Sequence, residues 1–265
     1  MISCVLFLLL SPQTHAEDRL EVLSGAPSPW SMQFILNYSG PSVEMPLDKY
    51  APNSAHDPVP PRVILSGSMA LRYRISPNKS LGLGTGVQVD TPFHNPQNFS
   101  MTNPTVDYSV ISEDKSMFQL LTAMSYTDSV YSKLGYSTNV AYSLSSSWKI
   151  FDSEKWKVNL QFGGSHNFFQ MDNVFQIEDS FGLYPSLDFA FASNWSLRTV
   201  SAFSAFRFRG TSDWIWSRFS QTLGAGWIWN KDLFLYGYVL FYPSPFANMQ
   251  SHDSSLGLSV VVNLY

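Results

Sequence analysis

The sequence contains a single cysteine, Cys4, which lies in an apolar run at the N-terminus. The run from Met1 to Leu10 is too short to span a bilayer, and Pro12 followed by Thr14 and Ala16 is typical of a secretory cleavage site. We expect residues 1–16 to be a signal peptide that is cleaved after Ala16. The mature chain would then have no thiol, which excludes disulfides, cysteine metal ligands and cysteine nucleophiles.

Charged residues and long apolar runs are also scarce. Charged side chains make up 14% of the chain, whereas a soluble domain usually carries about 25%. The balance of 16 basic and 20 acidic residues leaves no basic tract for nucleic acid. No mature segment has the roughly 20 apolar residues that a membrane-spanning helix requires. A chain of this composition that crosses a membrane must therefore satisfy its backbone hydrogen bonds between strands.

Alternating apolar and polar side chains extend from Trp30 to the C-terminus, with aromatic residues at 15% of the chain. Alternation with a period of two, broken by turns of unequal length, is the signature of a transmembrane β-barrel. We therefore predict an all-β fold, an antiparallel up-and-down barrel of about 12 strands over residues 30–265, preceded by a periplasmic segment at 17–29. The expected strands cover residues 30–38, 63–75, 81–89, 106–110, 118–126, 134–144, 156–162, 187–191, 195–208, 215–229, 234–242 and 256–264.

Several strands carry special features. Gly82, Gly84 and Gly86 alternate with apolar residues, so they face inward, where they allow close approach of lumen contents or a bent wall. Pro185 is expected to begin the eighth strand, because proline cannot donate to a ladder. A β-bulge near residues 204–205 would shift Phe206 and Phe208 to the apolar outer face. The eleventh strand is expected to place Phe234, Tyr236, Tyr238, Leu240 and Tyr242 outside.

Turn lengths are an independent indication of orientation. The connections after the second, fourth, sixth, eighth and tenth expected strands are short, whereas those after the first, third, seventh and eleventh are long. In bacterial outer-membrane barrels the short turns lie in the periplasm. Both termini are therefore expected on the periplasmic side.

Tryptophan residues gather beside the turns. Four lie next to short turns, at Trp148, Trp156, Trp195 and Trp229, and Trp214 and Trp216 lie at the opposite end. Amphipathic rings favour the headgroup level, so this pattern indicates two aromatic girdles. The alternative is a soluble β-sandwich in which tryptophan fills the core.

On these features the chain resembles the outer-membrane β-barrel proteins of Gram-negative bacteria. The resemblance covers the mature chain and is one of class, since no specific family motif matches. It implies outer-membrane lipid, lipopolysaccharide and the barrel-assembly machinery as partners. Barrels of this class usually end in an aromatic residue, as Tyr265 does, although the apolar alternation at 256–264 is one residue out of phase with it.

The predicted inward charges suggest a transport function. Basic residues outnumber acidic ones, and a cationic lining favours anions in a pore. The alternative is that these residues pair across the lumen and fill it. The predicted lumen-lining residues are Arg62, Arg72, Arg74, Asp90, Lys157, Asp188 and Arg198, joined by Arg207, Arg209 and Arg218 if the bulge is present.

Enzymatic and metal-binding functions have weaker support. Some outer-membrane hydrolases place a His and a Ser two residues apart on the lipid-facing surface; His166 matches the first, but the second position is Phe168, so that motif lacks its nucleophile. His56, Asp57, His94, His252 and Asp253 lie on expected loops without the spacing of a metal site. The glycines at 82–86 lack the Lys and helix of a phosphate loop. We therefore expect no enzyme, cofactor or metal.

The sequence thus favours a narrow channel for passive diffusion of small solutes, with a weak anion preference. A plugged barrel that serves a structural or surface-interaction role through its loops is the alternative. An outer-membrane lipid hydrolase is the third and least supported interpretation.

Overall fold

The structure is a computed structural model that describes residues 28–52, 62–111, 117–124, 140–168, 177–217, 219–230, 232–242 and 254–264. The predicted signal peptide and Tyr265 lie outside the described residues. No helix within the described ranges is long and apolar enough to cross a membrane.

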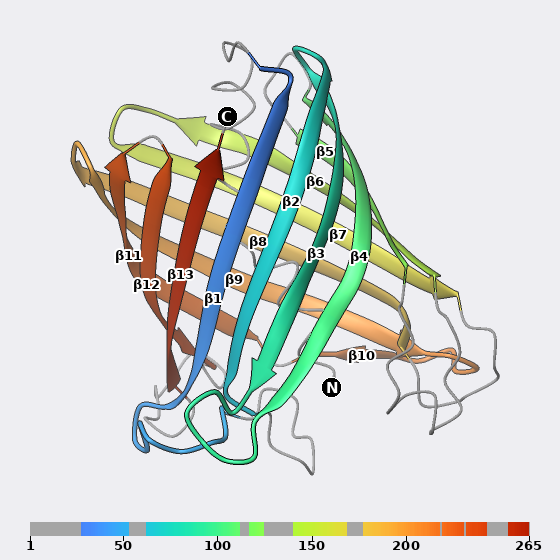
Figure 1. Cartoon of the computed structure of the whole chain (residues 1–265), viewed down its shortest axis with the longest axis vertical. Coiled ribbons are helices and arrows are strands. Elements are labelled where there is room, and N and C mark those ends of the chain that lie inside the picture. The colour runs from blue at the N-terminus through green and yellow to red at the C-terminus, as the bar shows by residue number, and fades with distance from the viewer. Residues whose placement is uncertain are drawn as a thin grey trace.

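The described chain is built from antiparallel strands that wind around a central axis (Figure 1). The strands are β1 (Trp30–Ser42), β2 (Ile64–Ser76), β3 (Lys79–Asp90), β4 (Asn98–Ile111), β5 (Met117–Met124), β6 (Val140–Asp152), β7 (Trp156–Phe168), β8 (Ile177–Ala192), β9 (Trp195–Phe208), β10 (Trp214–Trp216), β11 (Ser220–Asn230), β12 (Leu233–Phe241) and β13 (Ser254–Leu264).

The pairings form a continuous circuit. Consecutive strands from β1 to β9 pair in order, β11 pairs with β12, β12 with β13, and β13 with β1. The second edge of β9 pairs first with β10 and then with β11, so these two strands share one position in the wall. Thirteen strands with one shared position give twelve positions. The predicted antiparallel β-barrel of about 12 strands is confirmed.

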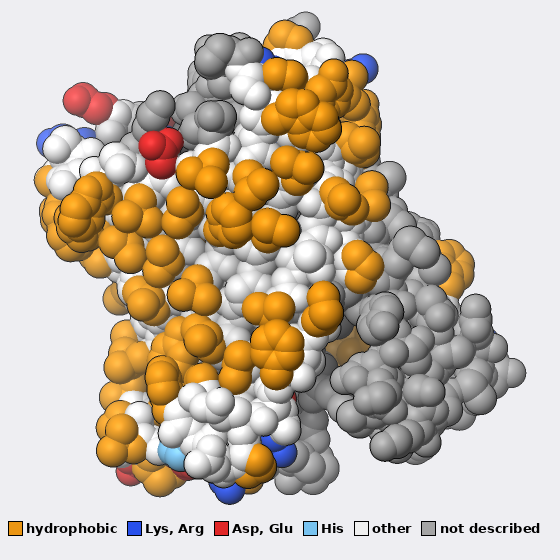
Figure 2. Space-filling model, viewed as in Figure 1, with side chains coloured by type: hydrophobic (Ala, Val, Ile, Leu, Met, Phe, Trp, Pro, Cys, Tyr) orange, Lys and Arg blue, Asp and Glu red, His pale blue; other side chains and the backbone are white. Residues whose placement is uncertain are grey.

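Side chains alternate between lumen and exterior as the sequence predicts. Trp30, Phe34 and Leu36 are exposed on the outer face of β1, whereas Ile35 packs against buried residues inside the barrel. Figure 2 shows hydrophobic side chains spread over the outer face, with charged side chains gathered toward the two ends. Such a surface is suited to acyl chains, with polar residues near the headgroups.

The two ends of the barrel have connections of different length. The short connections at 77–78, 153–155, 193–194 and 231–232 lie at the end where β1 begins and β13 finishes. We call this the short-turn end. The opposite end carries the longer connections, including 43–63 and 242–253, and we call it the long-loop end.

Some strand boundaries differ from the sequence prediction. The fourth strand begins at Asn98, inside an expected loop, and the sixth extends to Asp152, beyond the expected end at residue 144, while residues 134–139 lie outside the described residues. The eighth strand begins at Ile177, so Pro185 lies within it, opposite Leu160 of β7. On the β9 side the pairing skips residues 184–185 and resumes at Ser186. The proline is accommodated because its missing N–H falls where the ladder is already interrupted.

The predicted bulge in β9 is wrong. Residues from Phe203 to Arg207 keep one register with β8. The irregularity lies instead in the facing segment, where the register against β9 changes by one residue between β10 and β11. Phe206 therefore points into the barrel and is only 6% exposed, and Arg207 points outward. The sequence prediction placed Phe206 on the outer face because apolar residues occupy both faces of this part of β9.

The predicted outer face of β12 is also wrong. Phe234, Tyr236 and Leu240 are buried inside the barrel. The rings of Phe234, Tyr236 and Tyr238 stack in sequence, with centroids 6.4 and 5.3 Å apart. They lie against inner-wall glycines on the neighbouring strands, Gly224, Gly226 and Gly257. The prediction took the aromatic residues as the lipid-facing side of this strand. The outer face is instead formed by the leucine and valine residues that alternate with them, such as Leu235 and Val239.

Gly257 tests this ring-on-glycine packing. A Cβ at Gly257 would lie 2.2 Å from the Tyr238 ring, whereas a Cβ at Gly237, on the outer face, would meet nothing within 4 Å. We expect Gly257→Val to lower the free energy of unfolding by about 1–3 kcal/mol, the usual effect of overpacking. Gly237→Val, the matched control, should leave it unchanged or raise it. Urea unfolding in lipid vesicles measures both, and equal stability of the two variants would contradict this packing.

Candidate functional site

The lumen has two unequal walls. Bulky buried side chains project from β8, β9 and β12, including Tyr184 (2% exposed), Phe206 and Tyr236 (7%). In the circuit of strands, β2 and β3 lie opposite β8 and β9. Small residues occupy the inner face of β2 and β3: Ser66, Ser68, Ala70, Gly82, Gly84 and Gly86. At these positions the inner face of β2 and β3 therefore carries smaller side chains than the inner face of β8 and β9.

One inward charge pair joins β2 to β4 near the short-turn end. Arg72 Nη2 lies 3.3 Å from Asp107 Oδ2, and the Ser109 hydroxyl donates to the same oxygen at 3.1 Å. The Asp107 carboxylate occupies the space that a Cβ on Gly82 would fill. Gly82 therefore makes room for a side chain of the adjoining strand. The sequence interpretation missed Asp107, although it alternates with Val106 and Tyr108.

A second inward charge pair joins β8 to β9. Arg198 Nε lies 3.6 Å from Asp188 Oδ1, and both residues are largely buried. Lys157 of β7 is paired in register with Asp188, so the three charges form one row across three strands. Two acidic groups, Asp107 and Asp188, thus neutralise two of the predicted inward arginines.

The other predicted lumen residues occupy varied positions. Arg74 faces inward and donates to the Ser28 carbonyl at 3.4 Å. Asp90 accepts a hydrogen bond from Gln88 Nε2 at 2.8 Å. Arg62 is exposed before β2, in a bridge with Tyr50. Arg207 faces outward, so its predicted inward position is wrong. Arg209 follows the end of β9, and Arg218 lies outside the described residues.

Aromatic side chains gather outside the barrel at both ends. Trp148, Trp156, Trp195 and Trp229 are exposed at the short-turn end. Ring contacts there join Trp156 to Phe189 at 4.3 Å and Trp195 to Trp227 at 5.6 Å, and Trp227 was not included in the prediction. At the long-loop end, Trp214 and Trp216 flank Phe181 with centroid distances of 5.1 and 5.6 Å.

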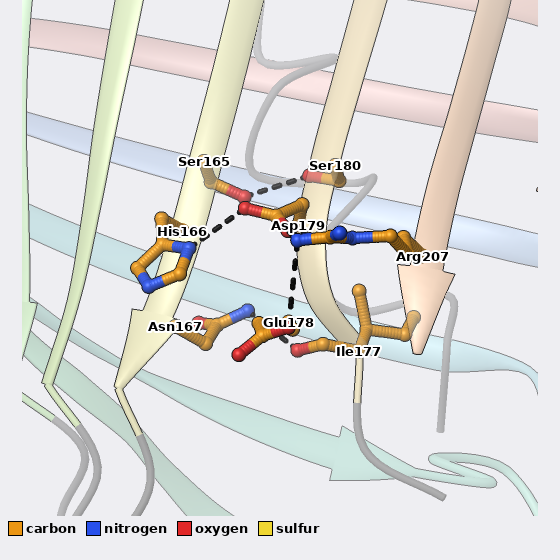
Figure 3. Close-up of polar contacts among 8 residues, drawn as sticks. All are labelled: Ser165, His166, Asn167, Ile177, Glu178, Asp179, Ser180 and Arg207. Atoms are coloured by element: carbon orange, nitrogen blue, oxygen red, sulfur yellow. Dashed lines mark hydrogen bonds and ion pairs between the residues drawn. The ribbon is translucent and has the colours of Figure 1, made fainter. Parts of the chain in front are cut away.

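A polar network lies on the outer face near the long-loop end (Figure 3). His166, Asp179 and Arg207 are directly paired positions on β7, β8 and β9. His166 Nδ1 lies 2.7 Å from Asp179 Oδ1, and Arg207 Nε donates to Asp179 Oδ2 at 3.0 Å. Asp179 was missed because residues 169–181 were expected to form a loop.

Metal binding has no support among the described residues, where no cluster of His, Cys, Asp and Glu could hold an ion. His94 Nε2 instead contacts the Leu47 carbonyl at 2.8 Å. The other loop candidates, His56, Asp57, His252 and Asp253, lie outside the described ranges.

No family model matches the chain, and no curated protein matches it. Among solved structures, it is similar to an outer membrane channel from Pseudomonas putida F1, with a TM-score of 0.55 and 11% identity over 91% of this chain and 97% of that one. The translocator domain of the autotransporter NalP from Neisseria meningitidis has a TM-score of 0.48 at 8% identity, with 95% of each chain covered. The NanC porin has 0.48 at 6% identity, covering 88% of this chain and 99% of that one. The chain therefore has the fold of the Gram-negative outer-membrane β-barrels.

Proposed function

We propose that this chain is a narrow channel of the Gram-negative outer membrane, through which small polar solutes diffuse passively. The observation that carries the proposal is the unequal lumen, in which small side chains on β2 and β3 face bulky ones on β8 and β9. A barrel of about twelve strands lies between small filled barrels and wide porins. The proposed passage runs beside the small-residue wall, where the described side chains take up less of the lumen.

The chemistry of the β1–β3 wall suits hydrated solutes. Gln33 and Asn37 of β1 and Ser66 and Ser68 of β2 are half-buried and face the lumen. Their hydroxyl and amide groups can exchange hydrogen bonds with a passing solute, which lowers the cost of removing its water. We infer a pathway for small solutes whose hydroxyl, amide or ionic groups need such partners.

Orientation follows the usual rule for this fold. The short-turn end faces the periplasm and the long-loop end faces the exterior. β1 then begins, and β13 ends, on the periplasmic side.

A plugged barrel with a surface role remains the competing function. It is favoured by the depth of burial on the β8–β9–β12 wall, where Tyr184 and Phe206 leave little exposed surface. In that case the loops would carry the function. Conductance separates the two proposals, because a plugged barrel passes no current.

Cysteine substitution can locate the pathway, since the chain from residue 17 has no thiol. Ser68→Cys places one thiol on the small-residue wall. We expect a charged methanethiosulfonate reagent to lower single-channel conductance of this variant several-fold in planar bilayers, because the adduct fills the narrow passage.

Ser204→Cys is the matched control. Ser204 lies on the inner face of β9 but is only 5% exposed, so its thiol should not react and conductance should not change. If the reagent lowered conductance of the Ser204 variant but not of the Ser68 variant, the passage would run beside β8 and β9, and the proposed pathway beside β2 and β3 would be wrong. Absence of any current in correctly folded protein would exclude the channel.

Charge selectivity should depend on the inward cations beside the two ion pairs. Arg74 and Lys157 both face the lumen near the short-turn end. Taken with Arg72, Arg198, Asp90, Asp107 and Asp188, they leave these named inward residues with one more basic than acidic group, a small positive excess that favours anions. We expect a weakly anion-selective reversal potential in a KCl gradient, and Arg74→Gln with Lys157→Gln should bring it close to the non-selective value.

The control is Arg207→Gln, which removes a cation from the outer face. It should leave the reversal potential unchanged. Cation selectivity in the unsubstituted chain would contradict the proposed anion preference while leaving the channel proposal intact.

A further inference from the structure

Two connections at the long-loop end display large apolar side chains. They are residues 43–50, which follow β1, and residues 91–97, which join β3 to β4, and we call them the rim loops. Leu47 is 86% exposed, Phe93 74% and Met45 54%. Single exposed apolar residues need no explanation, but several that are exposed together mark an interaction surface.

The rim loops are bonded to each other, so these side chains are held together. The His94 Nε2 atom lies 2.8 Å from the Leu47 carbonyl oxygen, which joins the two loops at their apolar residues. Val63, just before β2, links them a second time: its amide donates to the Lys49 carbonyl at 2.9 Å, and its carbonyl accepts from the Thr91 amide at 2.8 Å. Val63 and Thr91 are both buried, so the rim loops share a small interior.

Each rim loop also has hydrogen bonds of its own. In the first, the Met45 amide donates to the Ser42 carbonyl at 3.1 Å, and the Asp48 amide donates to the Met45 carbonyl at 3.0 Å. In the second, Gln97 Nε2 donates to the Pro92 carbonyl at 2.6 Å. The exposed apolar side chains therefore belong to folded loops, and burying them within the chain would require these turns to open.

The apolar surface of the rim loops continues the lipid-facing surface of β1. The Phe93 ring meets the Tyr38 ring edge-on, with the centroids 5.8 Å apart. Tyr38 is paired with Leu258, which is 44% exposed on the outer face of β13. The Tyr38 ring lies over Gly40, two residues closer to the long-loop end, where a Cβ would come within 3.1 Å of it. The outer face of β1 and the second rim loop are therefore in direct contact.

Charged residues lie beside the apolar ones in the first rim loop. Glu44 precedes Met45, and Asp48 and Lys49 follow Leu47. Figure 2 shows such a mixture at the foot of the view, where hydrophobic side chains lie among charged ones. A segment of this kind is suited to a membrane interface, with its apolar side chains among the acyl chains and its charges among the headgroups.

The distribution of tryptophan favours lipid as the partner of this surface. At the long-loop end, Trp214 and Trp216 lie on β10, which pairs with β9, whereas β2 and β3 lie opposite β8 and β9 in the circuit. The sequence has no tryptophan between residues 31 and 147, so β2, β3 and β4 bring none to the membrane boundary. Barrels carry aromatic residues around both boundaries, and Phe93 of the rim loops supplies one on this side.

We propose that the rim loops insert into the outer leaflet of the membrane, where Met45, Leu47 and Phe93 contact the acyl chains of the surrounding lipid. Both loops were expected to be external from the sequence, and the insertion makes them an anchor that fixes the height of β1–β4 in the bilayer. The occupant of this surface is membrane lipid, not a protein or a transported solute. The choice of leaflet rests on the orientation proposed for the barrel, whereas the insertion itself does not.

Single-cysteine labelling of the chain from residue 17, folded in phosphatidylcholine vesicles, tests the insertion. This chain has no thiol of its own, so Leu47→Cys and Phe93→Cys each carry one NBD fluorophore. We expect blue-shifted NBD emission at both positions. Phospholipid with a doxyl group on its acyl chain should quench this emission several-fold, because the quencher and the label lie at the same depth.

Glu44→Cys is the matched control, since Glu44 is an exposed, charged residue of the same loop. Its label should emit as in water and be quenched much less by the doxyl lipid. Heat-modifiable gel mobility shows that each labelled variant is folded. Equal quenching at all three positions would contradict the assignment of Leu47 and Phe93 to the acyl region.

Two further results would overturn the anchor. Water-like emission at Leu47→Cys and Phe93→Cys would mean that the rim loops stand clear of the bilayer. Blue-shifted emission without quenching by the doxyl lipid would mean that protein, from this chain or from a second copy, covers them. Neither result affects the channel proposal, since conductance is measured separately.

Discussion

Hydrogen bonding between neighbouring strands is the constraint on which the whole molecule depends. Acyl chains offer no partner for backbone N–H and C=O groups, so each strand in a membrane needs a ladder on both edges. The pairing of β8 with β9 meets this need by returning the circuit to its starting strand. The local break between β10 and β11 is tolerated because both pieces pair with β9 in succession, and the amide of Ser217 between them still donates to Ser204.

Because the strands close into a barrel, the side chains that face inward share a lumen of limited volume. Tyr236 and Tyr238 can lie flat against their own wall because Gly224 and Gly257 provide no side chains beneath them. On β3 the inward glycines make room for side chains of the neighbouring strand β4, with the Asp107 carboxylate over Gly82 and the Thr105 hydroxyl beside Gly84. The distribution of glycine thus determines which part of the lumen is filled.

Much of the fold could be predicted from the sequence, because lipid-facing alternation is a local property. The strand ladder, its antiparallel order and the inward direction of Arg72 and Asp188 all follow from a period of two. The errors fall where both faces of a strand are apolar. Phe206 and Tyr236 were placed outside because aromatic residues are typical of the lipid face, but burial inside the lumen suits them equally. When both faces of a strand are apolar, an alternation with a period of two does not indicate which face points to the lipid and which to the lumen.

The candidate sites were less predictable, since they depend on register between strands. His166 was recognised as an outward residue, but its partner Asp179 lay in an expected loop, and the register of β7 against β8 that pairs them is not a local property of the sequence. Asp107 was overlooked for a similar reason, because the strand that carries it has weak alternation.

The length of β8 links the two sites. This strand carries Asp188 in the lumen near one end and Asp179 on the lipid face near the other. Their positions differ by an odd number of residues, and neighbouring residues in a strand point to opposite faces. A slip of β8 by a single residue would therefore expel one carboxylate into the acyl chains while drawing the other into the interior, so the two carboxylates together lock the strand in its observed alignment.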